Sequence, residues 1–427
     1  MEQRTVDLMQ KKLKRRYAAE WRFQWYGRIS ILIALAFLLL MFINIVGKGY
    51  SAFQQTHIRL AVELEADTFP SPTSDTAALY SADYSGLIKM ALRKQFPDVT
   101  NRRDKRALYQ LLSSGAGYNL RDLVVADPAL IGQTIEVWLT ADDDVDMYIK
   151  HSPRDNTGTE PTAERLSEKQ RTWLEQLHSE GRIEKQFNST FFSAGDSREP
   201  EQAGIWGALV GTFFTLLVTI CLSFPIGVGA AIYLEEFAPK NKWTDLIEVN
   251  VNNLAAVPSI VFGLLGLAVF INFFGVPRSA PIAGGLVLTL MTLPVIIISS
   301  RAVLKAVPPS IREAALGIGA SKVQMVFSHV VPLALPGMLT GTIIGMGRAL
   351  GETAPLLMIG MMAFVVDIPA NLFDSSTALP VQIYLWADSP ERGFEERTSA
   401  AIMVLLAFLV VMNAAAVYLR KRFERKW

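Results

Sequence analysis

The sequence predicts a mainly α-helical, polytopic membrane protein with six transmembrane helices and a small α+β external domain inserted between helices 1 and 2. Three observations predict this fold class. Of the 427 residues, 51% are apolar and 19% are charged. The apolar residues gather in six long blocks, and a long polar segment separates the first block from the second. Because about 20 apolar residues cross a roughly 30 Å hydrocarbon core, a soluble enzyme is excluded.

The six predicted spans are 29–46, 205–234, 254–274, 282–303, 337–365 and 400–418. Four prolines fall within them, namely Pro225, Pro258, Pro294 and Pro355. Membrane helices tolerate proline where neighbours satisfy the freed carbonyl, so we expect kinks or breaks at these positions. The first block lacks a small-residue cleavage site after it, and we interpret it as an uncleaved anchor.

Basic residues flanking the spans predict the orientation. Residues 1–28 hold eight lysines or arginines against three acids, and the tail after Tyr418 holds five against one. Both termini are therefore expected in the cytoplasm, which agrees with an even number of spans. The loop between the fourth and fifth spans then also lies inside, and the segment 47–204 lies outside.

The predicted organisation has four parts: a basic cytoplasmic arm (1–28), an anchor helix (29–46), an external α+β domain (47–204) and a transmembrane domain (205–427) with an inner loop at 308–332. The basic arm either controls topology or lies as an amphipathic helix on the lipid surface. A formal net charge of +1 gives no sign of a nucleic-acid partner, and the single cysteine excludes a disulfide framework.

The external segment carries 24 acids against 18 lysines and arginines. Alternating residues at 135–139, an acidic turn at 141–144 and the run 145–149 predict a β-hairpin. An apolar pattern at 166–177 followed by Gly181 predicts a helix with a glycine C-cap. Its histidines (His57, His151 and His178) lack metal-ligand spacing, and no catalytic constellation is visible.

The inner loop 308–332 carries two apolar stripes at helical spacing. The first comprises Ile311, Ala314, Ala315 and Ile318, and the second comprises Val323, Val326, Phe327 and Val330. The glycines Gly317 and Gly319 separate them, so we expect two short helices joined by a glycine bend. Such stripes in an aqueous loop either lie on the protein's own bundle or enter a groove on a partner.

At these residues the sequence resembles a known family. Glu313-Ala314-Ala315, followed after three residues by Gly319, is similar to the EAA motif of binding-protein-dependent ABC importer permeases. In that family the loop docks into a cleft of the ATPase subunit. The later I-x-L-P part of the motif is matched here only at Pro332.

Further segments resemble the PstA-type permeases of phosphate ABC importers, which are type I. These segments are Gly204-Ile205-Trp206-Gly207-Ala208-Leu209-Val210-Gly211-Thr212, Tyr233-Leu234-Glu235-Glu236-Phe237-Ala238-Pro239, Pro258-Ser259-Ile260-Val261-Phe262-Gly263 and Arg348-Ala349-Leu350-Gly351-Glu352-Thr353-Ala354-Pro355. The resemblance covers about residues 200–427, and nothing carries over to the external domain.

The resemblance implies a non-enzymatic transport subunit in a bacterial cytoplasmic (inner) membrane. Its partners would be an ABC ATPase, a second homologous permease, an external phosphate-binding protein and membrane lipid. The chain lacks a G-x-x-x-x-G-K-[ST] motif. We therefore expect no cofactor in this chain, with ATP and magnesium bound by the partner ATPase.

Arg348 and Glu352 are charges near the middle of the fifth predicted span, where a charge costs at least about 2.5–3.5 kcal/mol. At i and i+4 they share a helix face. They form either a structural salt bridge or an anion site in which Arg348 binds phosphate and Glu352 holds it. Arg301 is a second candidate for the substrate pathway, or it snorkels to the inner interface.

Three alternatives stay open at this point. The first is a membrane sensor with an external ligand domain, although such a sensor needs an intracellular output domain. The second is a secondary transporter, although no inverted repeat is apparent. The third is an ABC permease for another oxyanion, such as sulfate or molybdate.

Overall fold

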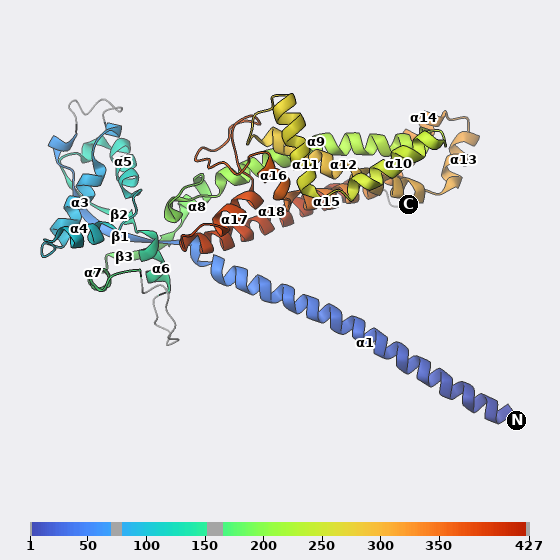
Figure 1. The fold of residues 1–427 in the computed structure, drawn as a ribbon, viewed down its shortest axis with the longest axis horizontal. Coiled ribbons are helices and arrows are strands. Elements are labelled where there is room, and N and C mark those ends of the chain that lie inside the picture. Colours follow the sequence, from blue (N-terminus) through green and yellow to red (C-terminus); the bar gives the residue numbers. More distant parts are fainter. Residues whose placement is uncertain (1, 70–78, 152–164, 424–427) are drawn as a thin grey trace.

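A computed structural model describes residues 2–69, 79–151 and 165–423. It consists of a long helical bundle and a smaller domain built on a sheet, which we call the sheet domain (the described residues of 50–205) (Figure 1). The sheet domain lies at one end of the bundle, and the inner-loop helices α13 (Pro309–Gly317) and α14 (Lys322–Met325) lie at the other end.

The helical part contains these elements: α1 (Glu2–Gly49), α9 (Trp206–Ile232) with the π-helix Tyr233–Phe237, α10 (Lys242–Ala255), α11 (Ser259–Gly266) with the π-helix Leu267–Phe273, α12 (Pro281–Ala306), α13 (Pro309–Gly317), α14 (Lys322–Met325), the π-helix Val326–Val330, α15 (Val331–Leu350), α16 (Ala354–Met358), α17 (Leu379–Ala387) and α18 (Gly393–Phe423). Within the described residues, five helices are long and apolar enough to cross a membrane. A sixth candidate span is the pair α10 and α11, which is bent by 102°. The predicted class of multi-span helical membrane protein is confirmed.

The four prolines act in two different ways. Pro225 and Pro294 lie inside the continuous helices α9 and α12. Pro258 is the N-cap of α11 at the 102° bend, and Pro355 lies in the first turn of α16, after the chain has left α15. A proline at a helix start loses no intrahelical bond, so the breaks occur where the helix can restart on a proline.

The centre of the bundle is formed by α9, α12 and α15, which pack closely through small residues. A Cβ added at Gly341 of α15 would lie 2.1 Å from Ser299 Oγ of α12, and one at Gly285 of α12 would lie 2.5 Å from Val218 of α9. Glycine at these positions lets helix backbones approach one another. At Gly341, α15 therefore packs against another helix of this same chain.

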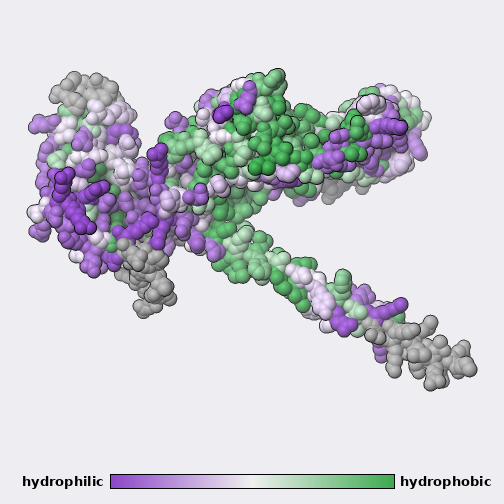
Figure 2. Space-filling model, in the orientation of Figure 1, coloured by the Kyte–Doolittle hydropathy of each residue, from purple (hydrophilic) through white to green (hydrophobic). Residues whose placement is uncertain are grey.

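The basic arm and the anchor form one helix, α1, which leaves the bundle at an angle (Figure 1). Its apolar span is unburied within the chain, and Figure 2 shows an apolar surface on the part of the helix nearer the bundle. It touches α18 only near its end, where Gly49 packs against Ala400 and Met403. Lipid or another subunit must therefore surround this helix.

The sheet domain has three antiparallel strands in the order β2-β1-β3: β1 (Gln54–Glu63), β2 (Thr134–Thr140) and β3 (Ile183–Phe187). Its helices are α3 (Tyr84–Gln95), α4 (Arg102–Tyr109), α5 (Ala116–Ala126), α6 (Asp143–His151), α7 (Glu168–Ser179) and α8 (Ser189–Ser193), and the 3-10 helix Pro200–Gln202 leads to the bundle. Leu60, Leu87, Leu108 and Leu139 are among the fully buried side chains of its core. The small α+β domain is thus present.

The predicted hairpin at 135–149 is wrong in its second half. Residues 134–140 form β2, but the following segment is helix α6 rather than a strand. β2 pairs with β1 instead, with Thr140 opposite His57 and Thr134 opposite Glu63. Acids in the first turn of α6 and Lys150 in its last turn complement the helix dipole. By contrast, α7 ends as predicted, with Gly181 at φ +68°.

Candidate functional site: the inner loop and the buried arginines

The inner loop begins where α12 ends at Ala306 and α13 starts on Pro309. Gly319 has φ +89° and closes α13, because its N–H donates to the Leu316 carbonyl at 3.0 Å. Ser321 then caps α14 with a capping box completed by Gln324. The predicted glycine bend is present.

The second half of the loop differs from the expectation of a separate short helix. The helix that starts at Lys322 continues through the π-helix Val326–Val330 into α15 and ends at Leu350. The second apolar stripe is therefore the first part of a membrane helix.

Each apolar stripe has some side chains that pack against the bundle and others that are exposed. Ala315, Val326 and Val330 are buried against the protein's own helices, whereas Ile318 is 81% exposed and Phe327 is 56% exposed. The alternative of packing on the protein's own bundle is therefore confirmed for part of the loop, and docking to a partner stays a prediction. One side of the loop holds the bundle, and Glu313, Ala314 and several apolar side chains remain uncovered.

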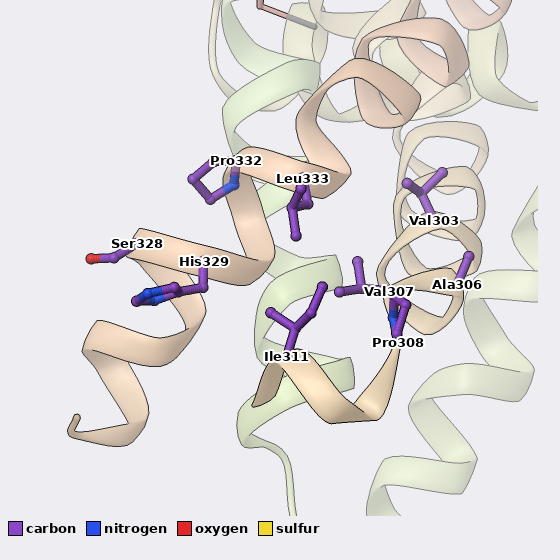
Figure 3. Close-up of a pocket in the computed structure, with 9 residues that line it drawn as sticks. All are labelled: Val303, Ala306, Val307, Pro308, Ile311, Ser328, His329, Pro332 and Leu333. Atoms are coloured by element: carbon purple, nitrogen blue, oxygen red, sulfur yellow. The ribbon is translucent and has the colours of Figure 1, made fainter. Parts of the chain in front are cut away.

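Between the two halves of the loop lies an apolar groove of about 780 Å³, shown in Figure 3. Its lining residues are Val303, Ala306, Val307, Pro308, Ile311, Ser328, His329, Pro332 and Leu333. Figure 3 shows Ile311 of α13 pointing toward Leu333 of α15 across this space. The groove lies between α13 and the end of α12 on one side and the π-helix Val326–Val330 with the start of α15 on the other.

Arg312 connects the inner loop to two bundle helices. Its guanidinium contacts Glu236 at the end of α9, with 2.6 Å between Nη2 and Oε1, and the Glu236 side chain is 6% exposed. The same guanidinium donates to the carbonyls of Leu304 and Val307 at the end of α12, at 2.9 and 2.7 Å. Sequence reasoning missed this role, although Arg312 precedes the Glu313-Ala314-Ala315 motif.

Arg301 lies in a second ionic cluster near the same end of the bundle. Its Nη2 is 2.9 Å from Glu248 Oε2 of α10, and its Nε is 3.4 Å from Glu235 Oε2. Lys305 is 3.7 Å from Glu235. This guanidinium therefore joins α12 to α9 and α10, and its proposed place on a substrate pathway stays a prediction.

Arg348 and Glu352 lie at the end of α15 rather than near its middle, because the helix stops at Leu350. They do pair at i and i+4, with 3.6 Å between Nε and Oε1. The Arg348 side chain is 49% exposed and that of Glu352 is 20% exposed. Half of the Arg348 side chain is thus uncovered for another ligand.

The structure separates the two candidate pathway arginines along the bundle. Gly341 of α15 packs against Ser299 of α12, and a second glycine contact one turn earlier shows that the helices run antiparallel. Arg301 is therefore level with residue 339, which lies nine residues before Arg348. At 1.5 Å per residue the axial separation of their backbones is about 14 Å, and their carboxylate partners lie in different parts of the bundle.

No group of three or more histidine, cysteine, aspartate or glutamate side chains in the described part of the chain is placed to hold a metal ion. The features that remain are a multi-span bundle, a half-exposed inner loop and arginines paired with carboxylates. Together they define a membrane transport subunit rather than a soluble enzyme.

Comparison with known proteins identifies the class. Residues 223–425 match the family of "Binding-protein-dependent transport system inner membrane component", and residues 10–157 match a domain of unknown function (DUF3333). The chain is 31% identical over 255 residues to a probable ABC transporter permease protein, YqgI, of Bacillus subtilis, covering 56% of this chain and 86% of the relative.

Two further relatives are the phosphate transport system permease proteins PstA 1 of Mycobacterium tuberculosis (33% identical, covering 52% of this chain and 72% of the relative) and PstC of Haemophilus influenzae (32% identical, covering 49% and 73%). Among solved structures, an inward-facing MetNI methionine ABC transporter matches with a TM-score of 0.44 and 19% identity, covering 52% of this chain and 98% of that one. The chain belongs to the binding-protein-dependent transport system inner membrane component family, as a permease of the PstA type.

Proposed function

We propose that this chain is a membrane-spanning permease subunit of an ATP-driven importer that carries inorganic phosphate across the bacterial cytoplasmic membrane. The observation that carries the proposal is the inner loop, whose exposed side includes Glu313, Ala314 and Ile318. The phosphate permeases named among the relatives supply the substrate.

The exposed side of the loop would contact an ABC ATPase subunit. ATP and magnesium would bind to that subunit, and this chain would supply no cofactor. Ile318, Val323 and Phe327 are each more than half exposed, and exposed apolar side chains on two short elements fit a cleft on a partner. Because α13 is tied to α9 and α12 through Arg312, movement of the ATPase would be passed to two bundle helices.

The proposed orientation places both termini and the inner loop in the cytoplasm and the sheet domain outside. The loop helices lie at the end of the bundle opposite the sheet domain (Figure 1). The basic arm and the basic tail then follow the positive-inside rule. A second homologous permease and an external phosphate-binding protein would complete the importer, with lipid around the outer surface of the bundle.

Arg348 is the proposed phosphate ligand on the pathway, with Glu352 holding its side chain. A guanidinium stays charged and offers directed donors to a tetrahedral oxyanion. The half-exposed side chain and the long 3.6 Å contact with Glu352 leave donors free for an anion. Arg301, with two carboxylate partners, would instead act further along the bundle.

Reconstitution of the full chain tests this function. The chain would be co-purified with its permease and ATPase partners, placed in liposomes, and assayed for ATP hydrolysis with the binding protein and phosphate, sulfate or molybdate. Stimulation by phosphate is expected. Stimulation by sulfate or molybdate alone would show that this anion, and not phosphate, is the substrate. Purification of the chain without any ATPase would overturn its assignment to an ATP-driven importer.

A pair of variants tests the docking surface. Ile318→Asp should lose the ATPase on purification, because it places a charge on the most exposed apolar side chain of the loop. Phe373→Asp is the matched control, because Phe373 is 59% exposed on the segment between α16 and α17. Equal retention of ATPase by both variants would contradict docking at the loop.

A further inference from the structure

The sheet domain is fixed to the start of α18 through buried charges. Lys150 of α6, with a side chain only 5% exposed, lies 2.6 Å from Asp146 Oδ2 and 3.2 Å from Glu396 Oε2 of α18. Arg397, 4% exposed, donates to the Ala203 carbonyl at 3.0 Å. We call this contact region the joint.

The start of α18 is shaped around one carboxylate of the sheet domain. The Gly393 N–H donates to Asp143 Oδ2 at 3.2 Å. A Cβ added at Gly393 would lie 1.8 Å from Asp143 Oδ1. Only glycine leaves space for this carboxylate, so the two parts meet through a defined contact at this point.

The joint holds more acids than bases. Its carboxylates are those of Asp142, Asp143, Asp146, Glu201 and Glu396, and its buried cations are Lys150 and Arg397. Full ionisation would leave three negative charges without a buried counter-cation. Glu201 is 3% exposed, and its Oε2 has no hydrogen-bond partner among the described residues. Burying such charge unpaired is costly.

Other charged groups surround the joint without removing this excess. They are Asp144 and His151 of α6, Glu199 before the 3-10 helix, and His57 of β1. Asp144 pairs with Arg165, and His151 is 3.4 Å from Glu396 but half exposed. Burial lowers the pKa of His57, which opposes any contribution of positive charge from that side.

The carboxylates respond to this environment and have access to water. Burial, and then the charge of Glu201, raise the pKa of Asp142 and that of Asp143 to about 7. Burial also raises the pKa of Glu201. Asp142 lines a surface groove of about 420 Å³ together with Ser113 and Glu199, so protons can reach the joint from solvent.

We propose that the joint is a proton-binding site through which the sheet domain reports external acidity to the permease. Protons on Asp142 and Asp143 hold the sheet domain on the start of α18, and their loss in alkaline medium loosens it. Because α18 packs along α15 and α17, a loosened joint changes the support of the bundle at its outer end. The joint faces the external medium only in the proposed orientation, whereas its binding of protons does not depend on that orientation.

The sign follows from proton linkage. The carboxyl groups of Asp142 and Asp143 bind protons more tightly in the joint than in water, because burial and the charge of Glu201 raise their pKa, although the Gly393 N–H opposes this for Asp143. The stabilisation is complete below the ordinary carboxyl pKa of 3.8 and is lost as the pH rises through about 7. Docking is therefore stronger at pH 6 than at pH 8.

Infrared spectroscopy of the full chain in lipid nanodiscs tests proton binding directly. A protonated carboxylic acid has its own C=O stretch, and for a pKa near 7 its amplitude at pH 8 should be about tenfold below that at pH 6. The band should shrink in Asp142→Asn and in Asp143→Asn and persist in Asp144→Asn, the control in the same turn. A wild-type spectrum without a band that titrates between pH 6 and pH 8 overturns the proposal, and so does a titrating band that is unchanged in both Asp142→Asn and Asp143→Asn.

Spin-label distances test the mechanical consequence. In a Cys221→Ser background, labels at Tyr118→Cys on the sheet domain and Phe373→Cys on the bundle, both exposed, should give a narrow distance distribution at pH 6 and a broad one at pH 8. Adding Asp142→Asn and Asp143→Asn should keep it narrow at both values. Identical wild-type distributions at both pH values contradict a pH-dependent joint. Neither measurement needs the ATPase or phosphate, so the inference and the proposed function can fail separately.

Discussion

Replacing Glu236 by glutamine tests whether Arg312 fixes the inner loop to the bundle. The glutamate side chain is 6% exposed, and the Arg312 side chain is 21% exposed. Losing one partner of a buried pair costs about 3–5 kcal/mol. Arg312 keeps its two carbonyl acceptors on α12 and some contact with water, so the expected loss is smaller, about 2–3 kcal/mol, in the range of hydrogen bonds to charged groups.

The loss of stability should be confined to α13, because α13 has few other contacts with α9. Hydrogen exchange on the full chain in nanodiscs would measure it, and the α13 amides of Glu236→Gln should exchange about 30- to 150-fold faster, since each 1.4 kcal/mol corresponds to a factor of ten. Lys305→Gln is the control. Lys305 is 56% exposed and lies 3.7 Å from Glu235, so its loss should change stability by less than about 1 kcal/mol.

Two measurements distinguish transmission of movement by the Arg312–Glu236 pair from a general contribution of this pair to stability. If the Arg312–Glu236 pair transmits movement, Glu236→Gln should keep ATPase binding and basal hydrolysis while losing stimulation by transported anion. Unchanged α13 exchange in Glu236→Gln would refute the reasoning, and so would an equal effect of Lys305→Gln.

Three further variants probe the bundle, the bend and the proposed pathway. Gly341→Val should lower stability by about 1–3 kcal/mol, because its side chain would collide with a serine of α12, whereas Gly347→Ala should be tolerated; thermal unfolding in detergent compares them. Gly319→Ala should lower stability by about 1–2 kcal/mol, because Gly319 has a φ of +89°. Gly317→Ala, whose added methyl group meets open space, should leave stability unchanged. Equal thermal unfolding midpoints for the two variants would refute backbone strain at position 319. Arg348→Gln should abolish phosphate uptake and leave the assembled complex intact by size-exclusion chromatography, and normal uptake would exclude the ligand role.

The elements that the sequence predicts well are those whose signal is local. Long apolar blocks define spans because a helix must cross a fixed thickness. Gly319 and Gly181 mark helix ends because both adopt positive φ, and the spacing of Arg348 and Glu352 places them together without knowledge of neighbours. In each case the residues that decide the structure lie within a few positions of one another.

The features that the sequence did not predict depend on distant partners. The run 145–149 has strand-like composition but forms α6, and β2 pairs instead with β1 from a distant part of the chain. The position of Arg348 at a helix end depends on where α15 stops, and the place of Arg301 depends on carboxylates 53 and 66 residues away. Charge patterns indicate that a buried arginine needs a partner, but they do not say which one.

Two ionic contacts connect the inner loop and its neighbouring helices, and they would allow movement of a small loop to reach a large bundle. Arg312 ties α13 to the ends of α9 and α12, and Arg301 ties α12 to α9 and α10. A force applied to the exposed side of α13 therefore reaches three helices through side chains that are mostly buried. Gly337 and Gly341 of α15 pack directly against α12, so the same force would also reach the helix that carries Arg348. Movement of α12 together with α15 would then change what surrounds Arg348.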